Sequence, residues 1–376
     1  MTAIACQRDR FSIPPNIHYL NCAYMAPLSH DVVAAMENAA RLKAHPWEFT
    51  PPDFFSVCER FRTRASRLTG SDEDNLAIVP SVSYALAIAA KNLAFRPGQQ
   101  IVTLADQFPS NIYAWRKLAQ ERQGEIVTAR RDASDCWTAS VLDAIGEETA
   151  IVAVPHCHWA DGRMVDLQAV GEAARAVGAA LVLDLTQSLG AMPIDFAKVR
   201  PDFAVAACYK WLMGPYGIGL LYVDPKHHQG EPLEHNWINR AGSDDFARLV
   251  DYRDDFQPGA RRFDMGEKSN PPLLEGAGAG IEFLLEFGTE AVAETLAGRT
   301  TAIAHAAAEE GLTSAPIDTR APHFLSLDLP ADMVVGLAER LAEKQIHVSV
   351  RGQSLRVTPH LYNTDEDADA LVEALG

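Results

Sequence analysis

The sequence predicts an α/β fold: a large domain built on a mostly parallel sheet of seven strands, followed by a smaller α+β domain. Two observations support this prediction. Short apolar and β-branched segments alternate with amphipathic segments through the first two-thirds of the chain, as strands alternate with helices in parallel sheets. Beyond residue 224 the pattern changes to an irregular stretch, then helices and a few short strands. We expect the large domain to span residues 20–260 and the small domain 261–376, with residues 1–19 packed on the small domain.

Seven segments have the length and composition of strands, and they cover residues 76–79, 100–104, 125–129, 150–155, 180–184, 203–207 and 219–223. The amphipathic segments between them predict helices at 84–93, 112–123, 137–145 and 167–177. In such a sheet, ligands bind at the carboxyl ends of the strands. Residues that directly follow a strand are therefore the first candidates for a functional site.

The last part of the chain predicts helices at 272–287, 290–310, 333–344 and 366–375, and strands at 324–329, 347–350 and 354–358. Gly276, Gly278 and Gly280 imitate the glycine fingerprint of a dinucleotide-binding site, and a nicotinamide dehydrogenase would rest on them alone. However, Pro271 and Pro272 precede them, and proline starts helices rather than parallel strands. We interpret the glycines as sites of close helix packing.

The charge balance and the cysteine pattern limit the classes of function. With 33 Lys and Arg against 50 Asp and Glu, the chain lacks the basic face that nucleic acids or anionic membranes would need. Its densest basic stretch, residues 60–67, has helical spacing and is expected to be a solvated surface. No segment approaches the ~20 apolar residues that cross a bilayer. Six scattered cysteines without a CxxC pair indicate reduced thiols, so we expect a cytoplasmic enzyme.

Two candidate catalytic residues follow separate predicted strands. Asp184 ends the strand at 180–184, and Lys210 lies shortly after the strand at 203–207. A lysine in an apolar run is costly unless it is paired or functional, and a desolvated lysine can form a Schiff base with an aldehyde. A carboxylate beside a pyridine nitrogen keeps that ring protonated and therefore electron-withdrawing. The alternative is that Asp184 caps a helix and Lys210 lies at a strand end with its amine in water.

These residues, and their order along almost the whole chain, resemble the aminotransferase class V family of pyridoxal 5′-phosphate enzymes. That family includes cysteine desulfurases, selenocysteine lyases, kynureninases and isopenicillin N epimerase. The resemblance implies a fold type I architecture, pyridoxal 5′-phosphate as the cofactor, and a homodimer with active sites at its interface. It also implies that Lys210 binds the cofactor covalently, that Asp184 pairs with the pyridinium nitrogen, and that Gln187 contacts the phenolic oxygen.

Further motifs extend the resemblance to other cofactor-binding residues. Val82 and Ser83 follow the first predicted strand, where a helix start can offer backbone N–H groups to a phosphate; an ordinary serine cap is the alternative. Phe108 lies where the family stacks an aromatic ring on the cofactor. Tyr209 matches a tyrosine that reaches the phosphate in kynureninase-like members. Ser269 lies in a region that reaches the phosphate of the partner subunit.

The expected substrate-binding residues are Asn21, Trp159 and Arg356. Arg356 matches the family's arginine for the α-carboxylate of an amino acid, which a guanidinium can hold with two parallel hydrogen bonds; a surface arginine on an edge strand is the alternative. Trp159 stands where the family often has asparagine, and we expect it to line the substrate pocket. His156 and His158 form an H-x-H pair, but no other ligands with zinc spacing accompany them, so no metal is assigned.

The loop before Arg356 separates the branches of the family. Cysteine desulfurases need a mobile cysteine there, whereas residues 348–355 contain none and no cysteine follows Cys208. We therefore expect transamination or β-elimination of the C–S lyase type on a small α-amino acid. An amino-acid epimerase or a kynureninase-like hydrolase stays open as an alternative. From a different class, a non-catalytic relative that acts as a binding subunit is the other alternative.

Overall fold

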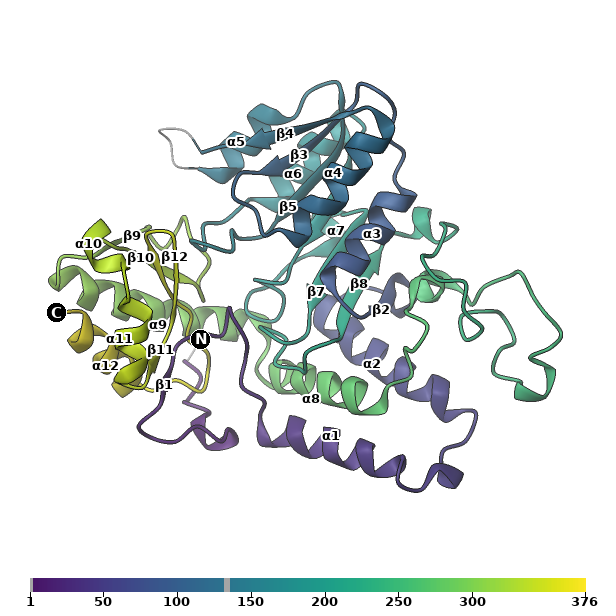
Figure 1. The fold of residues 1–376 in the computed structure, drawn as a ribbon, viewed down its shortest axis with the longest axis horizontal. Coiled ribbons are helices and arrows are strands. Elements are labelled where there is room, and N and C mark those ends of the chain that lie inside the picture. The colour runs from purple at the N-terminus through teal and green to yellow at the C-terminus, as the bar shows by residue number, and fades with distance from the viewer. Residues whose placement is uncertain (1–2, 132–135) are drawn as a thin grey trace.

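A seven-stranded sheet forms the centre of the computed structural model, which describes residues 3–131 and 136–376 (Figure 1). Side by side, the strands are β2 (Leu76–Val79), β8 (Gly219–Val223), β7 (Phe203–Ala207), β6 (Ala180–Asp184), β5 (Thr149–Pro155), β3 (Gln100–Leu104) and β4 (Glu125–Ala129). Only β8 runs antiparallel to its neighbours. The prediction of a mostly parallel seven-stranded sheet is therefore confirmed. Strands such as β5 and β7 are buried along their whole length, as is usual for a sheet that helices cover on both faces.

Helices connect the strands and cover the sheet. The connecting helices are α3 (Val82–Asn92), α4 (Ser110–Arg122), α5 (Trp137–Ala144), α6 (Leu167–Ala176) and α7 (Phe196–Val199). Three others, α1 (His30–Leu42), α2 (Asp53–Thr69) and α8 (Pro271–Phe287), lie side by side below the sheet in Figure 1. No helix in the described part of the chain is long and apolar enough to span a bilayer.

The glycines of α8 let this helix pack closely on its neighbours. A Cβ atom at Gly276 would lie 2.5 Å from Cγ of Met36 on α1. At Gly280 it would lie 2.5 Å from the backbone oxygen of Leu212. Contacts this short exclude any side chain, so the prediction of close packing at these glycines is confirmed.

The C-terminal part carries a four-stranded antiparallel sheet and a two-stranded parallel one. Their strands are β12 (Ser349–Arg351), β13 (Ser354–Val357), β10 (Leu325–Asp328) and β9 (Thr313–Ser314), and β1 (His18–Tyr19) with β11 (Ile346–His347). The helices are α9 (Thr289–Glu309), α10 (Ala331–Val334), α11 (Leu337–Glu343) and α12 (Asp365–Leu375).

Two predictions for this part were wrong. The single helix expected at 333–344 is two helices, because Gly336 adopts a left-handed φ of +69° between α10 and α11. The strand expected at 347–350 is divided between β11 and β12, which belong to different sheets.

Contacts of the N-terminal segment bear on the expected domain division. β1 pairs with β11, and Arg8 forms a 2.9 Å ion pair with Asp367 on α12, so residues near the N-terminus contact the C-terminal part. Residues 1–2 of the segment expected to pack there lie outside the described residues. By contrast, α8 packs on α1 and α2. The boundary at residues 260/261 stays a prediction.

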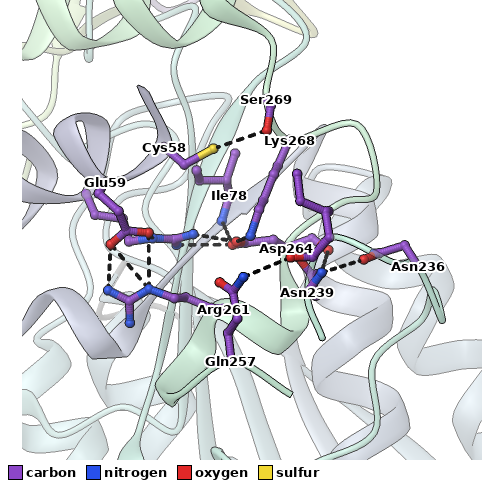
Figure 2. A network of polar contacts seen from close by, with 12 residues as sticks. Cys58, Glu59, Ile78, Asn236, Asn239, Gln257, Arg261, Asp264, Lys268 and Ser269 are labelled. Atoms are coloured by element: carbon purple, nitrogen blue, oxygen red, sulfur yellow. Dashed lines mark hydrogen bonds and ion pairs between the residues drawn. The ribbon is translucent and has the colours of Figure 1, made fainter. Parts of the chain in front are cut away.

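A buried ionic network joins α2 to the segment before α8 (Figure 2). The carboxylate of Asp264 accepts hydrogen bonds from Arg62, from Nζ of Lys268 at 2.9 Å and from the backbone N–H of Ile78 at 2.8 Å. All three charged side chains are buried. Burial alone would raise the pKa of Asp264, but Arg62 and Lys268 outweigh it and hold this pKa below its usual range.

This network corrects one expectation for the basic stretch 60–67. Arg62 is fully buried, because its face of α2 turns toward β2 and Asp264 supplies the compensating charge. The neighbouring Arg60 and Arg67 are about half exposed, in agreement with a solvated face.

We predict that Asp264→Ala lowers the free energy of unfolding by about 3–5 kcal/mol, because it leaves Lys268 buried without an anion and leaves Glu59 as the one remaining carboxylate partner of Arg62. Urea unfolding followed by circular dichroism measures the change. Asp255→Ala removes an exposed partner of Arg253 and serves as the control, for which a much smaller effect is expected. An unfolding midpoint for Asp264→Ala equal to that of the wild type would contradict the role given to the network.

Candidate active site

A pocket of about 220 Å³ opens at the carboxyl ends of the central strands. Its walls come from the segments that follow β2, β3, β5, β6 and β7 and from the turn before β8. Eight of the predicted site residues line it, namely Val82, Ser83, Phe108, Trp159, Asp184, Gln187, Tyr209 and Lys210. Asn21, Ser269 and Arg356 are not among its lining residues.

Lys210 is a buried amine without an ion-pair partner in the described part of the chain. It lies in a turn after β7 that backbone hydrogen bonds close, from Cys208 to Ile218 and from Gly214 to Cys208. Its side chain is 7% exposed, and burial lowers its pKa to about 8, although the charge of Asp184 opposes that shift. A minority of the amine, far more than for an ordinary lysine, is therefore neutral near physiological pH and can act as a nucleophile or a base.

Asp184 is the last residue of β6, and its buried carboxylate lines the same pocket. Burial raises its pKa, while hydrogen bonds from Thr186 and the charge of Lys210 oppose the shift. The backbone N–H of Thr186 lies 3.0 Å from Oδ1. Because a carboxylate offers about four acceptor positions, Asp184 keeps capacity for a further donor in the pocket.

The positive end of α3 faces the pocket at residues 80–83. Ser81 is the N-cap, and its hydroxyl oxygen accepts from the N–H of Tyr84 at 3.2 Å. The hydroxyl of Ser83 lies 3.1 Å from that of Ser81. The first N–H groups of a helix have no partner inside it, so a capped helix start and a phosphate cradle are compatible here.

Aromatic side chains form the outer wall of the pocket. The rings of Phe108 and Trp159 meet edge to face at 5.5 Å, and the indole N–H of Trp159 donates to the carbonyl of Asp106 at 2.7 Å. The ring of Tyr209 lies 4.6 Å from that of Tyr216. Burial raises the pKa of Tyr209 to about 12, so its hydroxyl stays protonated and can donate to an anion.

Arg356 on β13 borders the pocket through Trp159. Its Nη1 donates to the carbonyl oxygen of Trp159 at 2.9 Å, and its Nε has no partner among the described residues. The side chain is 2% exposed, and burial lowers its pKa to about 9, with a further contribution from Arg351. Asn21 lies beside the same hairpin, since its Oδ1 accepts from the hydroxyl of Ser349 at 2.9 Å and Ser349 pairs with Arg356 across the strands.

Ser269 lies away from this pocket, beside the network of Asp264 (Figure 2). Its hydroxyl donates to the carbonyl of Phe54 and lies 3.8 Å from Sγ of Cys58. The expectation that it reaches the phosphate of a partner subunit stays a prediction.

Gln107, Cys157 and Thr186 are among the lining residues that were not predicted as site residues from the sequence. Nε2 of Gln107 is buried without a partner among the described residues, which makes it a free donor in the pocket wall. Gln107 lies shortly after β3 and directly before Phe108, and this position could have indicated a pocket residue from the sequence. Thr186 lies between Asp184 and Gln187, and its contact with the carboxylate appears only once the turn is folded.

The fold and the pocket together define a class: an α/β enzyme with a buried lysine and a buried carboxylate at the edge of a mostly parallel sheet. Residues 52–371 match the family model described as Aminotransferase class-V, so the chain belongs to this family, whose members depend on pyridoxal 5′-phosphate. It is accordingly a pyridoxal-phosphate-dependent enzyme.

Individual relatives agree with this assignment. The chain is 28% identical to the uncharacterized aminotransferase YcbU of Bacillus subtilis, over 81% of this chain and 80% of that protein. It is 26% identical to isopenicillin N epimerase of Streptomyces clavuligerus, over 98% of this chain and 96% of that protein. The structure is similar to an apo cysteine desulfurase of Thermococcus onnurineus NA1, with a TM-score of 0.83 at 21% identity over 100% and 98% of the two chains. That likeness confirms the fold type I architecture.

We predict that the rate at which the cofactor-free protein takes up pyridoxal 5′-phosphate rises about fivefold from pH 7 to pH 8, because only the neutral amine of Lys210 attacks the aldehyde and its pKa is about 8. Growth of the visible absorption of the bound cofactor measures the rate. Lys210→Ala should develop no such band, whereas Lys91→Ala, at a partly exposed lysine, should match the wild type. A rate independent of pH over this range would contradict the low pKa of Lys210.

Proposed function

We propose that the protein catalyses transamination, or β-elimination of the C–S lyase type, on a small α-amino acid, with pyridoxal 5′-phosphate held in the pocket around Lys210. One observation carries the proposal: Arg356 is a buried guanidinium next to that pocket, and no carboxylate in the described part of the chain pairs with it. A buried charge without a partner is costly, so a ligand carboxylate is the natural complement of Arg356.

The pocket residues fit pyridoxal 5′-phosphate. The start of α3 at Val82 and Ser83 supplies N–H groups for the phosphate, and Tyr209 adds a hydroxyl. Asp184 can accept a hydrogen bond from a protonated ring nitrogen, and Phe108 can stack on the ring. Lys210 supplies the amine for the aldehyde.

Arg356 would hold the α-carboxylate of the substrate. Nε, which lacks a partner, and the neighbouring Nη groups can make two parallel hydrogen bonds to a carboxylate. This pair of hydrogen bonds would fix the orientation of the substrate Cα relative to Lys210. That orientation selects which bond of Cα is broken. The carbonyl of Trp159 holds the guanidinium in place from the opposite direction.

The chain's own groups then move the protons. When bound, pyridoxal 5′-phosphate supplies an aldehyde for amines and an electron-withdrawing ring. Lys210, with a pKa of about 8, is well matched to accept the proton of the substrate Cα near neutral pH. Asp184 would hold the proton on the ring nitrogen. Phe108 has no group that exchanges protons, so it contributes contact area only.

Two features support a route without a nucleophilic cysteine. Residues 348–355, which lead to Arg356, contain no cysteine. Cys157 does line the pocket, but it is buried, its thiol contacts the backbone oxygen of Gln187 at 3.4 Å, and burial raises its pKa. A protonated, enclosed thiol is a poor nucleophile.

We further propose a cytoplasmic homodimer with the pocket near the interface. Tyr216, in the pocket wall, is 67% exposed, and Tyr24 is 56% exposed. Exposed aromatic residues of this kind are typical of surfaces that a second subunit covers. Six free cysteines fit a reducing compartment. Sedimentation at twice the 41.0 kDa chain mass would support the dimer, and sedimentation at the chain mass would contradict it.

The test of the reaction is a panel of amino acids, including sulfur-containing ones, mixed with the cofactor-loaded protein. Formation of a keto acid with conversion of the cofactor indicates transamination, and pyruvate with ammonia indicates elimination. Inversion at Cα without either product would replace the proposal by an epimerase. No product and no spectral change with any amino acid would favour a binding subunit.

We predict that Arg356→Lys raises KM for the substrate ten- to a hundredfold, because the paired hydrogen bonds to a carboxylate contribute about 1.5–3 kcal/mol. Steady-state kinetics measure KM, and the visible spectrum of the bound cofactor should be unchanged. Arg320→Lys is the matched control: Arg320 is equally buried, lacks a carboxylate partner among the described residues and lies outside the pocket, where it donates to the hydroxyl of Thr300. An equal rise in KM for both variants would count against a specific role of Arg356.

A further inference from the structure

The Gln187 side chain is held at both ends of its amide group beneath the pocket. The indole N–H of Trp211 donates to Oε1 at 2.9 Å, and Nε2 donates to the carbonyl oxygen of Ala23 at 3.2 Å. Gln187 and Trp211 are both buried, and Gln187 lines the pocket. Trp211 directly follows Lys210 in the chain.

These two contacts determine which terminal atom of the Gln187 amide is the oxygen and which is the nitrogen. An indole N–H can only donate, so the atom that it meets must be the amide oxygen. A flipped amide would place N–H against N–H at Trp211 and oxygen against oxygen at Ala23, and both contacts are unfavourable. In the observed orientation, one N–H of Nε2 is bonded to Ala23 and the other has no acceptor among the described residues. Gln187 therefore keeps one amide N–H available as a donor.

His323 supports the same arrangement from the C-terminal part of the chain. Its Nε2 lies 2.6 Å from the backbone oxygen of Gln187, which can only accept, so Nε2 carries the proton. Burial lowers the pKa of His323 to about 3, and the ring is neutral in the working range. Its ring meets that of Trp211 edge to face at 4.2 Å. His323 thus fixes both the backbone of Gln187 and the plane of the indole.

We propose that Trp211 is a positioning residue that keeps an N–H of Gln187 directed at the phenolic oxygen of the bound cofactor. The inference rests on the proposed placement of pyridoxal 5′-phosphate. A donor at that oxygen stabilises the more negative form of the cofactor, so the cofactor loses its proton at a lower pH than it would without the donor. Without the indole N–H, only the bond from Nε2 to Ala23 holds the amide, so its orientation is less firmly fixed and its other N–H meets the phenolic oxygen for less of the time.

The test is the pH midpoint at which the visible absorption of the cofactor-loaded protein changes. Trp211→Phe keeps an aromatic ring but removes the N–H, and we expect the midpoint to rise by about one pH unit, the usual effect of losing one hydrogen bond to a charged group. Trp211→His can restore a ring N–H, and its midpoint should return toward that of the wild type. A midpoint for Trp211→Phe equal to the wild-type value would overturn the inference.

Trp115 offers a matched control elsewhere in the fold. Like Trp211, it is fully buried and donates to a side-chain amide oxygen, that of Asn111 at 3.0 Å. Trp115→Phe should lose stability in the same way but leave the midpoint unchanged. A shift equal to that of Trp211→Phe would show a general effect of destabilisation and would overturn the inference.

A second variant leaves Trp211 intact, in case Trp211→Phe does not fold. Gln187→Glu keeps an oxygen for the indole N–H and replaces the pocket-facing N–H by an oxygen, so its midpoint should rise at least as much. An unchanged midpoint in Gln187→Glu would also overturn the inference. If the wild type itself develops no visible band with pyridoxal 5′-phosphate, the proposed function fails, which is a distinct result.

Discussion

The desolvation of one amine is the constraint on which the site depends. Lys210 is buried in a turn after β7, and no carboxylate in the described part of the chain is close enough to pair with it. Asp184 shares the pocket and favours the charged amine, but the cost of burial is larger and the pKa falls to about 8. A direct ion pair would have held Lys210 as a cation. The sheet instead places the acid at the end of β6 and the amine in the turn after β7, so that each stays available to a ligand.

The same chain handles buried charge in an opposite way at the network of Asp264. There, Arg62 and Lys268 surround one carboxylate, which also accepts a backbone N–H, and the charges are compensated within the protein. Lys210 in the pocket and Arg356 beside it are also buried, but no carboxylate in the described part of the chain pairs with either of them. The first arrangement holds segments of the fold together, whereas the second leaves two cations available to a ligand, as the proposed function requires. This contrast is a stronger pointer to the site than burial or charge alone.

The sequence was informative where structure depends on local pattern. The seven strands of the large sheet were predicted because each is a short apolar run, and Asp184 and Lys210 were found because they stand at the ends of such runs. The sequence did not predict features that depend on contacts between residues far apart in the chain or on the conformation of a single residue. The burial of Arg62 depends on Asp264, 202 positions away, and nothing in the spacing of the arginines reveals it. The break before α11 depends on the left-handed φ of Gly336, which a helical periodicity hides. The contact between Trp211 and Gln187 likewise needs the folded turn.

The pocket also depends on how the C-terminal part of the chain meets the large sheet. Asp184 ends a strand of that sheet, and Gln187 and Lys210 follow such strands. By contrast, Arg356 belongs to β13 and His323 precedes β10. Two hydrogen bonds connect these groups, from Arg356 to the carbonyl of Trp159 and from His323 to the carbonyl of Gln187. Both donors are buried, and both acceptors are backbone atoms of residues that line the pocket. The placement of the Arg356 guanidinium and the position of Gln187 therefore depend on one packing arrangement. Under the proposed function, a shift of the C-terminal part would alter substrate binding and the cofactor environment together.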